Sequence, residues 1–451
     1  MVSTGFLAVL IILAIIVIAI VTKRCAEVLI AGSLLACLVY YKGSFLTKWC
    51  QLIQDTLAEN VWIVIVCGLF GSLIALLTAS KGSYGFSRLV SKVCNTERKT
   101  LFTSFIMGIL IFVDDYLNVL SIGVCMKGVY DKRKIPREAL AYMLDATGAP
   151  VCVMLPFSTW AVFYAGIFAD QDSVKKLGYA TGLQAYTHAI PYLFYPIFTL
   201  LIVFLFCLGV MPKMGAMKKA YQRVAETGMV YSEKSRKYNH DEEGYTEEGN
   251  IWDFIIPMGV LVALAIITSN LLLAVVVGIL VCFVMYVPRK VIRLEDFYTT
   301  ICKGFADMLP ILILLIMAFS LEKVLADMKM TDFIIQVAEP ILTKSVFPAV
   351  TFVLVATLAF TTGSLWGMSA IVTPIVFPLG AAVGANTILI MAAVISGGAF
   401  GSHACFYTDA TLLSSQSAGI DNMEHALSQL PYVLIAAGAS VAAYLVCGFV
   451  M

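Results

Sequence analysis

Charged residues are scarce in this chain of 451 residues, where Asp, Glu, Lys and Arg together make up only 13%. A typical soluble domain has about 25% charged residues. Hydrophobic residues make up 60% and the mean hydropathy is +0.91, which is more apolar surface than a soluble fold can bury. The net charge of +1 carries no information about nucleic acid, and we expect no nucleic-acid partner. We therefore predict an all-α polytopic membrane protein whose surroundings are the lipid bilayer.

Motifs for covalent or cofactor chemistry are also missing. The 12 cysteines stand singly and no Cys-x-x-Cys pair occurs, so the pattern indicates neither a zinc site nor a disulfide framework. No hydrolase, kinase or dinucleotide signature is found, and the lack of a phosphate-binding loop argues against ATP-driven transport. We expect a protein that is not an enzyme and that needs no cofactor.

Apolar runs long enough to cross a bilayer are what the chain does have. They lie at 6–21, 61–77, 190–210, 254–267, 271–287 and 431–450. The first run could be a signal peptide, but no Lys or Arg precedes it and no small-residue cleavage motif follows it. We interpret it as a transmembrane span.

The pattern of apolar spans repeats when the sequence is shifted by about 248 residues. The matching segments are 6–21 with 254–269, 44–58 with 292–306, and 61–79 with 309–327. A polar break at Asp114 and Asp115 matches one at Thr362 and Gly363. The sequence therefore predicts a first transmembrane repeat at 1–210, a hydrophilic linker at 211–250 and a second transmembrane repeat at 251–451.

The distribution of Lys and Arg orients these spans. If 101–127 crossed the membrane once, the basic run 127–137 would lie outside, whereas a re-entrant hairpin would keep this run in the cytoplasm. Each repeat would then have about five crossing helices, a re-entrant hairpin and a broken helix, and an odd number of crossings inverts the second repeat. We predict ten spans in the plasma (inner) membrane, a cytoplasmic linker and both termini outside.

Carboxylates at the tip of the first hairpin are the strongest site signal. Asp114, Asp115 and Asn118 interrupt an apolar run, and ionised carboxylates at membrane depth are costly. A bound cation, protonation or nearby helix N-termini would relieve this cost. The alternative is a short polar turn at the membrane surface.

A second break follows in the same half. Gly148, Pro150 and Pro156 interrupt the apolar run, and proline frees the carbonyl one turn earlier. Freed carbonyls and hydroxyls are oxygen ligands that suit Na⁺, whereas an ordinary proline kink is the alternative. The candidate ligands in this segment are Asp145, Thr147, Ser158 and Thr159.

The second half has fewer carboxylates and more hydroxyl groups in its breaks. Thr362 and Ser364 lie at the opposing hairpin tip, where they could bind an anionic group or a cation, or only allow close helix packing. His403 titrates near neutral pH and could carry protons, although a single His is more often structural. The predicted broken helix of this half extends over 396–411, and the remaining candidates in it are Thr408, Asp409 and Thr411.

Five motifs resemble those of the NhaC family of Na⁺/H⁺ antiporters. They are Phe-Val-Asp-Asp-Tyr-Leu-Asn at 112–118, Lys-Ile-Pro-Arg-Glu-Ala-Leu-Ala-Tyr-Met-Leu-Asp at 134–145, Ala-Pro-Val-Cys-Val at 149–153, Gly-Ser-Leu-Trp-Gly at 363–367, and Thr-Asp-Ala-Thr-Leu-Leu-Ser-Ser at 408–415. The resemblance extends over residues 61–432. It implies a secondary transporter of the ion-transporter superfamily type, built of inverted repeats and coupled to Na⁺ and H⁺. The same family contains Na⁺-linked exchangers of malate and lactate.

The resemblance also implies ion-binding roles for individual residues of this chain. The positions that match family motifs are Asp114, Asp115, Asn118, Asp145, Ser364, Trp366 and Asp409. Three of the carboxylates, Asp114, Asp145 and Asp409, become candidate Na⁺ ligands. One segment departs from the family, which often has Gly-Asp-His-Cys-Ser-Pro where this chain has Gly-Ser-His-Ala-Cys-Phe at 401–406. The lost carboxylate and proline leave room for an organic substrate.

Three functions are consistent with these observations. The first is Na⁺/H⁺ antiport by alternating access. The alternative is Na⁺- or H⁺-coupled transport or exchange of a small organic acid or an amino acid. A passive channel is a third, but duplicated and interrupted spans argue for alternating access. A homodimer is a candidate assembly that the sequence leaves open.

Overall fold

The computed structural model describes residues 4–22, 25–82, 93–239, 249–268, 270–330, 333, 343–362, 365–406 and 408–451. Within these ranges the chain forms helices and turns and no strand. The prediction of an all-α protein is therefore confirmed.

The helices of the first half precede the linker. They are α1 (Thr4–Thr22), α2 (Cys25–Tyr41), α3 (Phe45–Glu59), α4 (Val61–Ala79), α6 (Glu97–Leu110), α7 (Asp115–Lys132), α8 (Arg137–Thr147), α9 (Ala149–Cys152), α10 (Thr159–Ala169), α11 (Asp172–Lys175), α12 (Gly182–Ala189) and α13 (Phe194–Leu208).

The linker and the second half contribute the remaining helices. They are α14 (Gly215–Thr227), the short 3₁₀-helix η3 (Glu233–Tyr238), α15 (Trp252–Thr268), α16 (Leu271–Tyr286), α17 (Leu294–Asp307), α18 (Leu309–Asp327), α20 (Phe347–Thr362), α21 (Leu365–Ala382), α22 (Thr387–Ala404), α23 (Asp409–Ala418) and α24 (Asn422–Val450).

Helix boundaries recur along the chain at the spacing of the sequence pattern. The bounds of α4 and α18 differ by 248 residues at both ends, and those of α7 and α21 differ by 250. Two helices that follow breaks, α10 and α23, begin 250 residues apart. The hydropathy repeat thus corresponds to a repeated order of helices.

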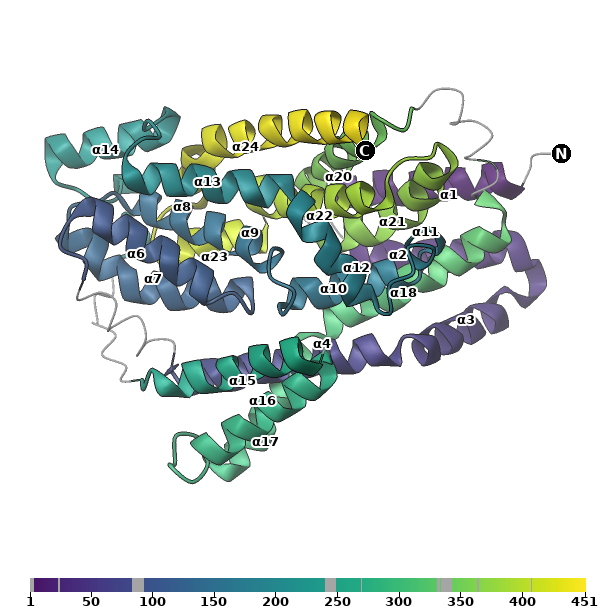
Figure 1. The fold of residues 1–451 in the computed structure, drawn as a ribbon, viewed down its shortest axis with the longest axis horizontal. Coiled ribbons are helices and arrows are strands. Elements are labelled where there is room, and N and C mark those ends of the chain that lie inside the picture. Colours follow the sequence, from purple (N-terminus) through teal and green to yellow (C-terminus); the bar gives the residue numbers. More distant parts are fainter. Residues whose placement is uncertain are drawn as a thin grey trace.

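The helices pack in two groups. The framework consists of α1–α4 and α15–α18, in which α4 packs against α17 and α2 packs against α18. The core unit consists of α6–α13 and α20–α24, in which α7 packs against α8 and α23, and α22 packs against α20 and α24. Figure 1 shows α4, α15, α16 and α17 along the lower edge of the molecule, and α13 and α24 along the upper edge. Each group contains helices from both halves of the chain.

Backbone contact between two halves holds the framework together. A Cβ atom on Gly71 of α4 would lie 2.3 Å from the carbonyl oxygen of Gly304 of α17, and the reverse distance is also 2.3 Å. Next to this crossing, Ser72 Oγ donates a hydrogen bond of 2.9 Å to the Ile301 carbonyl. Small residues allow this approach, which is how helices commonly associate in membranes.

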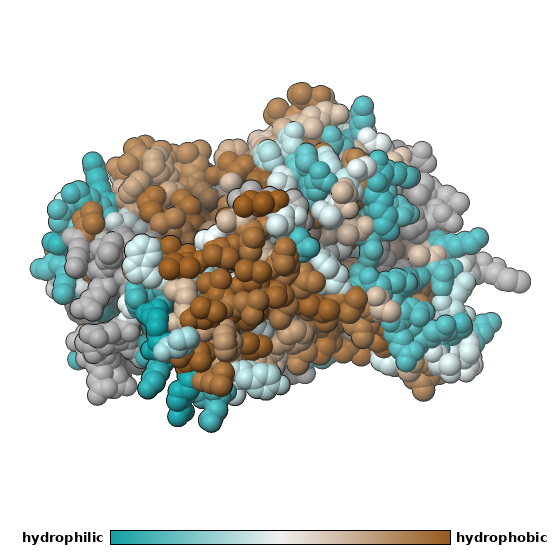
Figure 2. Space-filling model, turned by 60° about the horizontal axis from the view of Figure 1, so that its bottom comes forward, coloured by the Kyte–Doolittle hydropathy of each residue, from teal (hydrophilic) through white to brown (hydrophobic). Residues whose placement is uncertain are grey.

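The outer surface is that of a multi-pass membrane protein. Among the described residues, four helical stretches are long and apolar enough to cross a membrane, and a fifth arises if α12 and α13, bent by 50°, count as one span. The other apolar helices have 10–17 residues. Figure 2 shows hydrophobic residues across the middle of one face, with hydrophilic residues toward both ends. The number of ten spans stays a prediction.

The linker at 211–250 is partly helical and contacts the core unit. Its helix α14 packs against α24 and α8, and residues 240–248 lie outside the described part of the chain. Figure 1 shows α14 at the end of the molecule opposite the N-terminus. Met217, Ala220 and Val224 form the buried face of α14, while Lys218, Lys219 and Gln222 stay exposed.

The helix break in the second half is shorter than the predicted break at 396–411. Residues 396–398, Ser-Gly-Gly, do not interrupt a helix, because α22 runs through them and ends at Ala404, and α23 begins at Asp409. A Cβ on Gly397 would lie 2.7 Å from Val355 Cβ, and one on Gly401 would lie 2.2 Å from Ala359 Cβ. These glycines therefore allow α22 to pack closely against α20, and the helix, which has no proline, stays continuous.

Candidate functional site

The turn between α6 and α7 carries the two adjacent carboxylates. Asp114 is the N-cap of α7, and its Oδ1 accepts a hydrogen bond of 3.1 Å from the Leu117 amide. Asp115 is the first residue of the helix. Both residues are buried. A carboxylate at this position satisfies a free backbone N–H and faces the positive end of the helix dipole.

Asn118 fastens this turn to the neighbouring helix. Its Nδ2 lies 2.7 Å from the Gly108 carbonyl oxygen, 2.9 Å from that of Ile111 and 3.3 Å from that of Thr147. Carbonyl oxygens only accept hydrogen bonds, so they determine which way the amide faces. The opposite atom, Asn118 Oδ1, is buried and has no hydrogen-bond partner. It is therefore a free oxygen acceptor beside two buried carboxylates.

The first broken helix begins where α8 ends at Thr147. Pro150 lacks an N–H, Thr147 Oγ1 donates to the Met143 carbonyl at 2.7 Å, and α9 ends at Cys152. Ser158 then begins α10. Its hydroxyl lies 2.6 Å from the Cys152 carbonyl oxygen and accepts from the Ala161 amide at 3.1 Å. At the break, hydrogen bonds to the Ser158 side chain therefore replace the backbone hydrogen bonds that a continuous helix would form.

The second broken helix has the same local structure. Thr408 Oγ1 lies 2.7 Å from the Ser402 carbonyl oxygen, which is six residues earlier, as Cys152 is relative to Ser158. Thr408 also accepts from the Thr411 amide, three residues later. Thr411 Oγ1 in turn lies 2.9 Å from the Cys405 carbonyl oxygen. Two breaks 250 residues apart thus have one hydrogen-bond pattern.

The N-terminus of α10 lies between the α6–α7 turn and the start of α21. Thr159 donates its amide to the Val113 carbonyl at 3.2 Å and its hydroxyl to Asp114 Oδ2 at 3.3 Å. One residue later, the ring of Trp160 lies 4.8 Å from that of Trp366, at the start of α21. α10 therefore contacts the α6–α7 turn of the first half and the beginning of α21 in the second half.

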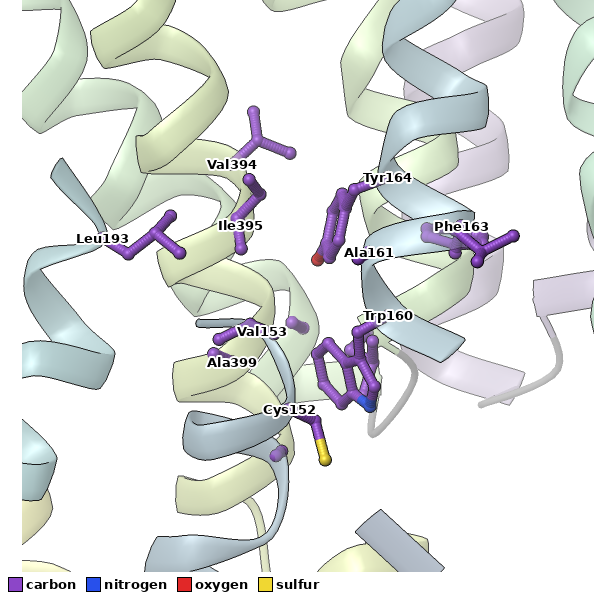
Figure 3. Close-up of a cluster of buried hydrophobic side chains, with 14 of the residues drawn as sticks. Cys152, Val153, Trp160, Ala161, Phe163, Tyr164, Leu193, Val394, Ile395 and Ala399 are labelled. Carbon is purple, nitrogen blue, oxygen red and sulfur yellow. The ribbon is translucent and has the colours of Figure 1, made fainter. Parts of the chain in front are cut away.

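Aromatic side chains continue this contact along α10. Phe163 packs edge-on against Trp366 with ring centroids 4.6 Å apart, and Tyr164 Oη is 3.0 Å from Ser369 Oγ of α21. Figure 3 shows Trp160 and Tyr164 directed toward α22, while Phe163 points away from it. α10 is thus packed between two elements of the second half.

A separate polar cluster surrounds Asp145. Its Oδ2 accepts a hydrogen bond of 2.8 Å from Gln429 Nε2 and lies 3.0 Å from His425 Nε2, both on α24. Gln429 Nε2 also donates to the His403 carbonyl at 2.7 Å, and His403 Nδ1 lies 2.8 Å from Tyr195 Oη. All five residues are buried. Four polar atoms here have no partner: Asp145 Oδ1, His403 Nε2, His425 Nδ1 and Gln429 Oε1.

The predicted site residues therefore fall into three places. Asp114, Asp115, Asn118, Thr147, Thr159 and Trp366 gather around the first hairpin turn and the start of α10, while Ser158 closes the break beside them. Asp145 and His403 belong to the buried cluster. Thr408 and Thr411 form the second break. The side chains of Thr362 and Asp409, and the whole of Ser364, lie outside the described residues.

Three residues of the cluster, Tyr195, His425 and Gln429, were missed by the sequence argument. His425 and Gln429 are four residues apart at the start of α24, so they share one face of that helix. A polar pair at this spacing before an apolar span is the signal that could have identified them. It was overlooked because the span was taken to begin at residue 431.

Broken helices with buried carboxylates beside them are features of secondary transporters, in which irregular backbone surrounds the bound ions. This chain belongs to the Na⁺/H⁺ antiporter family, whose family model matches residues 174–449. The resemblance to the NhaC antiporters is therefore confirmed at the level of the family.

One relative and two solved structures are similar to this chain. An uncharacterised protein of Haemophilus influenzae is 25% identical over 475 aligned positions, covering 96% of this chain and 89% of the relative. The fold is similar to that of Neisseria gonorrhoeae MtrF, described as illuminating a class of antimetabolite efflux pumps, with a TM-score of 0.65, 14% identity and coverage of 100% and 96%. It is also similar to the YdaH transporter of Alcanivorax borkumensis, with a TM-score of 0.60, 13% identity and coverage of 90% for both chains.

Proposed function

We propose that this protein exchanges Na⁺ for H⁺ by alternating access. In this proposal the two halves are inverted repeats, and α6–α7 and α20–α21 are re-entrant hairpins that enter from opposite sides. Support comes from the helix offsets and from Figure 1, where α6 and α7 lie in the half that holds α14, and α20 and α21 in the half that holds the N-terminus. The linker 211–250 would then be cytoplasmic and both termini outside.

The observation that carries the proposal is the free oxygen of Asn118 beside two buried carboxylates. Na⁺ prefers oxygen ligands, and a buried acceptor without a partner costs free energy unless something binds it. Asp114 caps α7 and Asn118 lies in the first turn of that helix, where Asn118 Nδ2 donates to the Ile111 carbonyl and Asp114 Oδ2 accepts from the Thr159 hydroxyl. These two residues, with the Thr159 hydroxyl, are the ligands that we propose for Na⁺. Asp409, at the corresponding place in the second half, is a further candidate.

Asp145 suits the other coupling ion. Its Oδ2 lies 3.0 Å from His425 Nε2, and a carboxylate and an imidazole at this distance can pass a proton between them. The cluster joins α8 of the first half to α22 and α24 of the second. A change of protonation there would affect the contact between the halves.

Transport in proteoliposomes tests the antiport proposal. We expect that adding Na⁺ outside vesicles with a preset pH gradient dissipates the gradient, and that Asp114→Asn abolishes this response. The matched control is Asp55→Asn, since Asp55 lies exposed on α3 of the framework. A wild-type protein that does not respond to Na⁺, or an Asp114→Asn variant as active as the wild type, would contradict the proposal.

Coupled transport of a small carboxylate or amino acid is the second candidate. It is favoured by the half-buried Trp366, which lies against Trp160 near the hairpin carboxylates, since aromatic rings bind organic substrates. The likeness of the fold to MtrF, described as illuminating a class of antimetabolite efflux pumps, points the same way. Thermal stability should be measured with organic acids and amino acids in Na⁺ and in choline buffer. Stabilisation by an organic compound only in Na⁺ would favour this candidate.

A further inference from the structure

Residues 211–239 of the linker are attached to the core unit. The helix α14 packs against α8 and α24, one from each half of the chain. At the start of the linker, the Met214 amide donates to Tyr432 Oη of α24 at 3.0 Å, and Lys213 Nζ lies 3.6 Å from a carboxylate oxygen of Glu97 at the start of α6. The linker thus contacts three helices that carry or support the candidate site.

The attachment to α8 is a two-point ion pair. Arg223 donates from its two terminal nitrogens to the two carboxylate oxygens of Glu138, at 2.8 and 2.9 Å. The Glu138 side chain is 4% exposed and that of Arg223 is 22% exposed. The Arg137 amide adds a backbone hydrogen bond of 2.9 Å to the Val230 carbonyl. A paired, largely buried contact of this kind holds its partners in one geometry, unlike an exposed ion pair.

The attachment to α24 uses hydroxyl and amide groups. The hydroxyls of Ser232 and Ser235 each lie 2.7 Å from Glu424 Oε2 in the first turn of α24. Asn239 Nδ2 donates to the Gly419 carbonyl at 2.8 Å, at the end of α23. The same stretch of linker that contacts α8 therefore also contacts the junction between α23 and α24.

We infer that residues 211–239 act as a clamp that fastens α8 to α24 and stays attached to the core unit while that unit moves against the framework. The inference rests on the proposed alternating access. A second contact between the same two helices supports it, since Asp145 of α8 also contacts His425 and Gln429 of α24 in the buried cluster. The linker and the buried cluster thus connect α8 to α24 at two separate places. In this inference the two helices form one rigid body, although α8 precedes the linker in sequence and α24 follows it.

Distance measurements between spin labels test the clamp directly. Lys219→Cys on α14, Met423→Cys on α24 and Tyr298→Cys on α17 place labels on three exposed positions, in a cysteine-free background. In proteoliposomes with and without Na⁺, we expect the 219–298 distance to change and the 219–423 distance to stay the same. A change in both distances would show that the core unit moves against the framework but that α14 does not stay fixed to α24, which would contradict the clamp. No change in either would contradict the motion and the clamp together.

A pair of arginine variants tests the cause. Arg223→Gln removes the two-point contact with Glu138, whereas Arg236→Gln is a matched control because Arg236 and its partner Glu233 are exposed. We expect Arg223→Gln to broaden the 219–423 distance distribution and to lower the rate of Na⁺-driven exchange several-fold, with Arg223→Lys in between. Arg236→Gln should match the wild type. If Arg223→Gln keeps the narrow distribution, the clamp is contradicted, whatever the rate.

Discussion

The hydrogen bonds of Gln429 offer a sharp test of the buried cluster. Gln429→Leu keeps nearly the same side-chain size and removes the amide group. Its Nε2 donates to Asp145 Oδ2 at 2.8 Å and to the His403 carbonyl at 2.7 Å, and the residue is 1% exposed. The substitution would therefore leave two buried acceptors with one partner fewer.

The expected magnitude follows from these two contacts. A hydrogen bond to a charged group contributes about 1.5–3 kcal/mol, and one between neutral groups contributes about 0.5–1.5 kcal/mol. Gln429→Leu should therefore lower the free energy of unfolding by about 2–4 kcal/mol. His425 remains beside Asp145 at 3.0 Å, which keeps the loss below that of an isolated buried charge.

Reversible unfolding in mixed detergent and SDS micelles measures this change. Gln416→Leu is the matched control, since Gln416 is exposed on α23 and an exposed substitution should change stability by less than about 0.5 kcal/mol. A double-mutant cycle with Asp145→Asn should give a coupling energy of about 0.5–3 kcal/mol. The reasoning would be refuted if Gln429→Leu were as stable as the wild type, or if the two substitutions were additive.

Two further predictions concern helix packing and the breaks. Gly71→Ala should destabilise the protein by about 1–3 kcal/mol, because the new Cβ would lie 2.3 Å from the Gly304 carbonyl oxygen. Gly259→Ala, where nothing lies within 4 Å of the new Cβ, should be neutral or more stable by up to about 1 kcal/mol, and denaturation of both variants would show the difference. Ser158→Ala and Thr408→Val should each cost about 0.5–2 kcal/mol because each removes a helix N-cap, and equal losses would support the equivalence of the two breaks.

Much of the helical order could be predicted from sequence. The hydropathy pattern repeats after about 248 residues, and the bounds of α4 and α18 differ by the same number. The sequence could predict this because the length of an apolar helix depends on its own residues. The first break was also predictable, since Pro150 removes a donor wherever the helix packs. The break in the second half was predicted too long at its N-terminal end, because glycines at 396–398 can either end a helix or allow close packing.

The sequence by itself determined the class of the protein, the repeated order of its helices and the burial of Asp114 and Asp115. These follow from composition and from local residue patterns. Tertiary structure alone decided that Asp145 meets His425 and Gln429, and that the charged linker is docked. Such contacts join residues as far as 284 positions apart. They depend on how helices from the two halves pack together, and no local pattern encodes that choice.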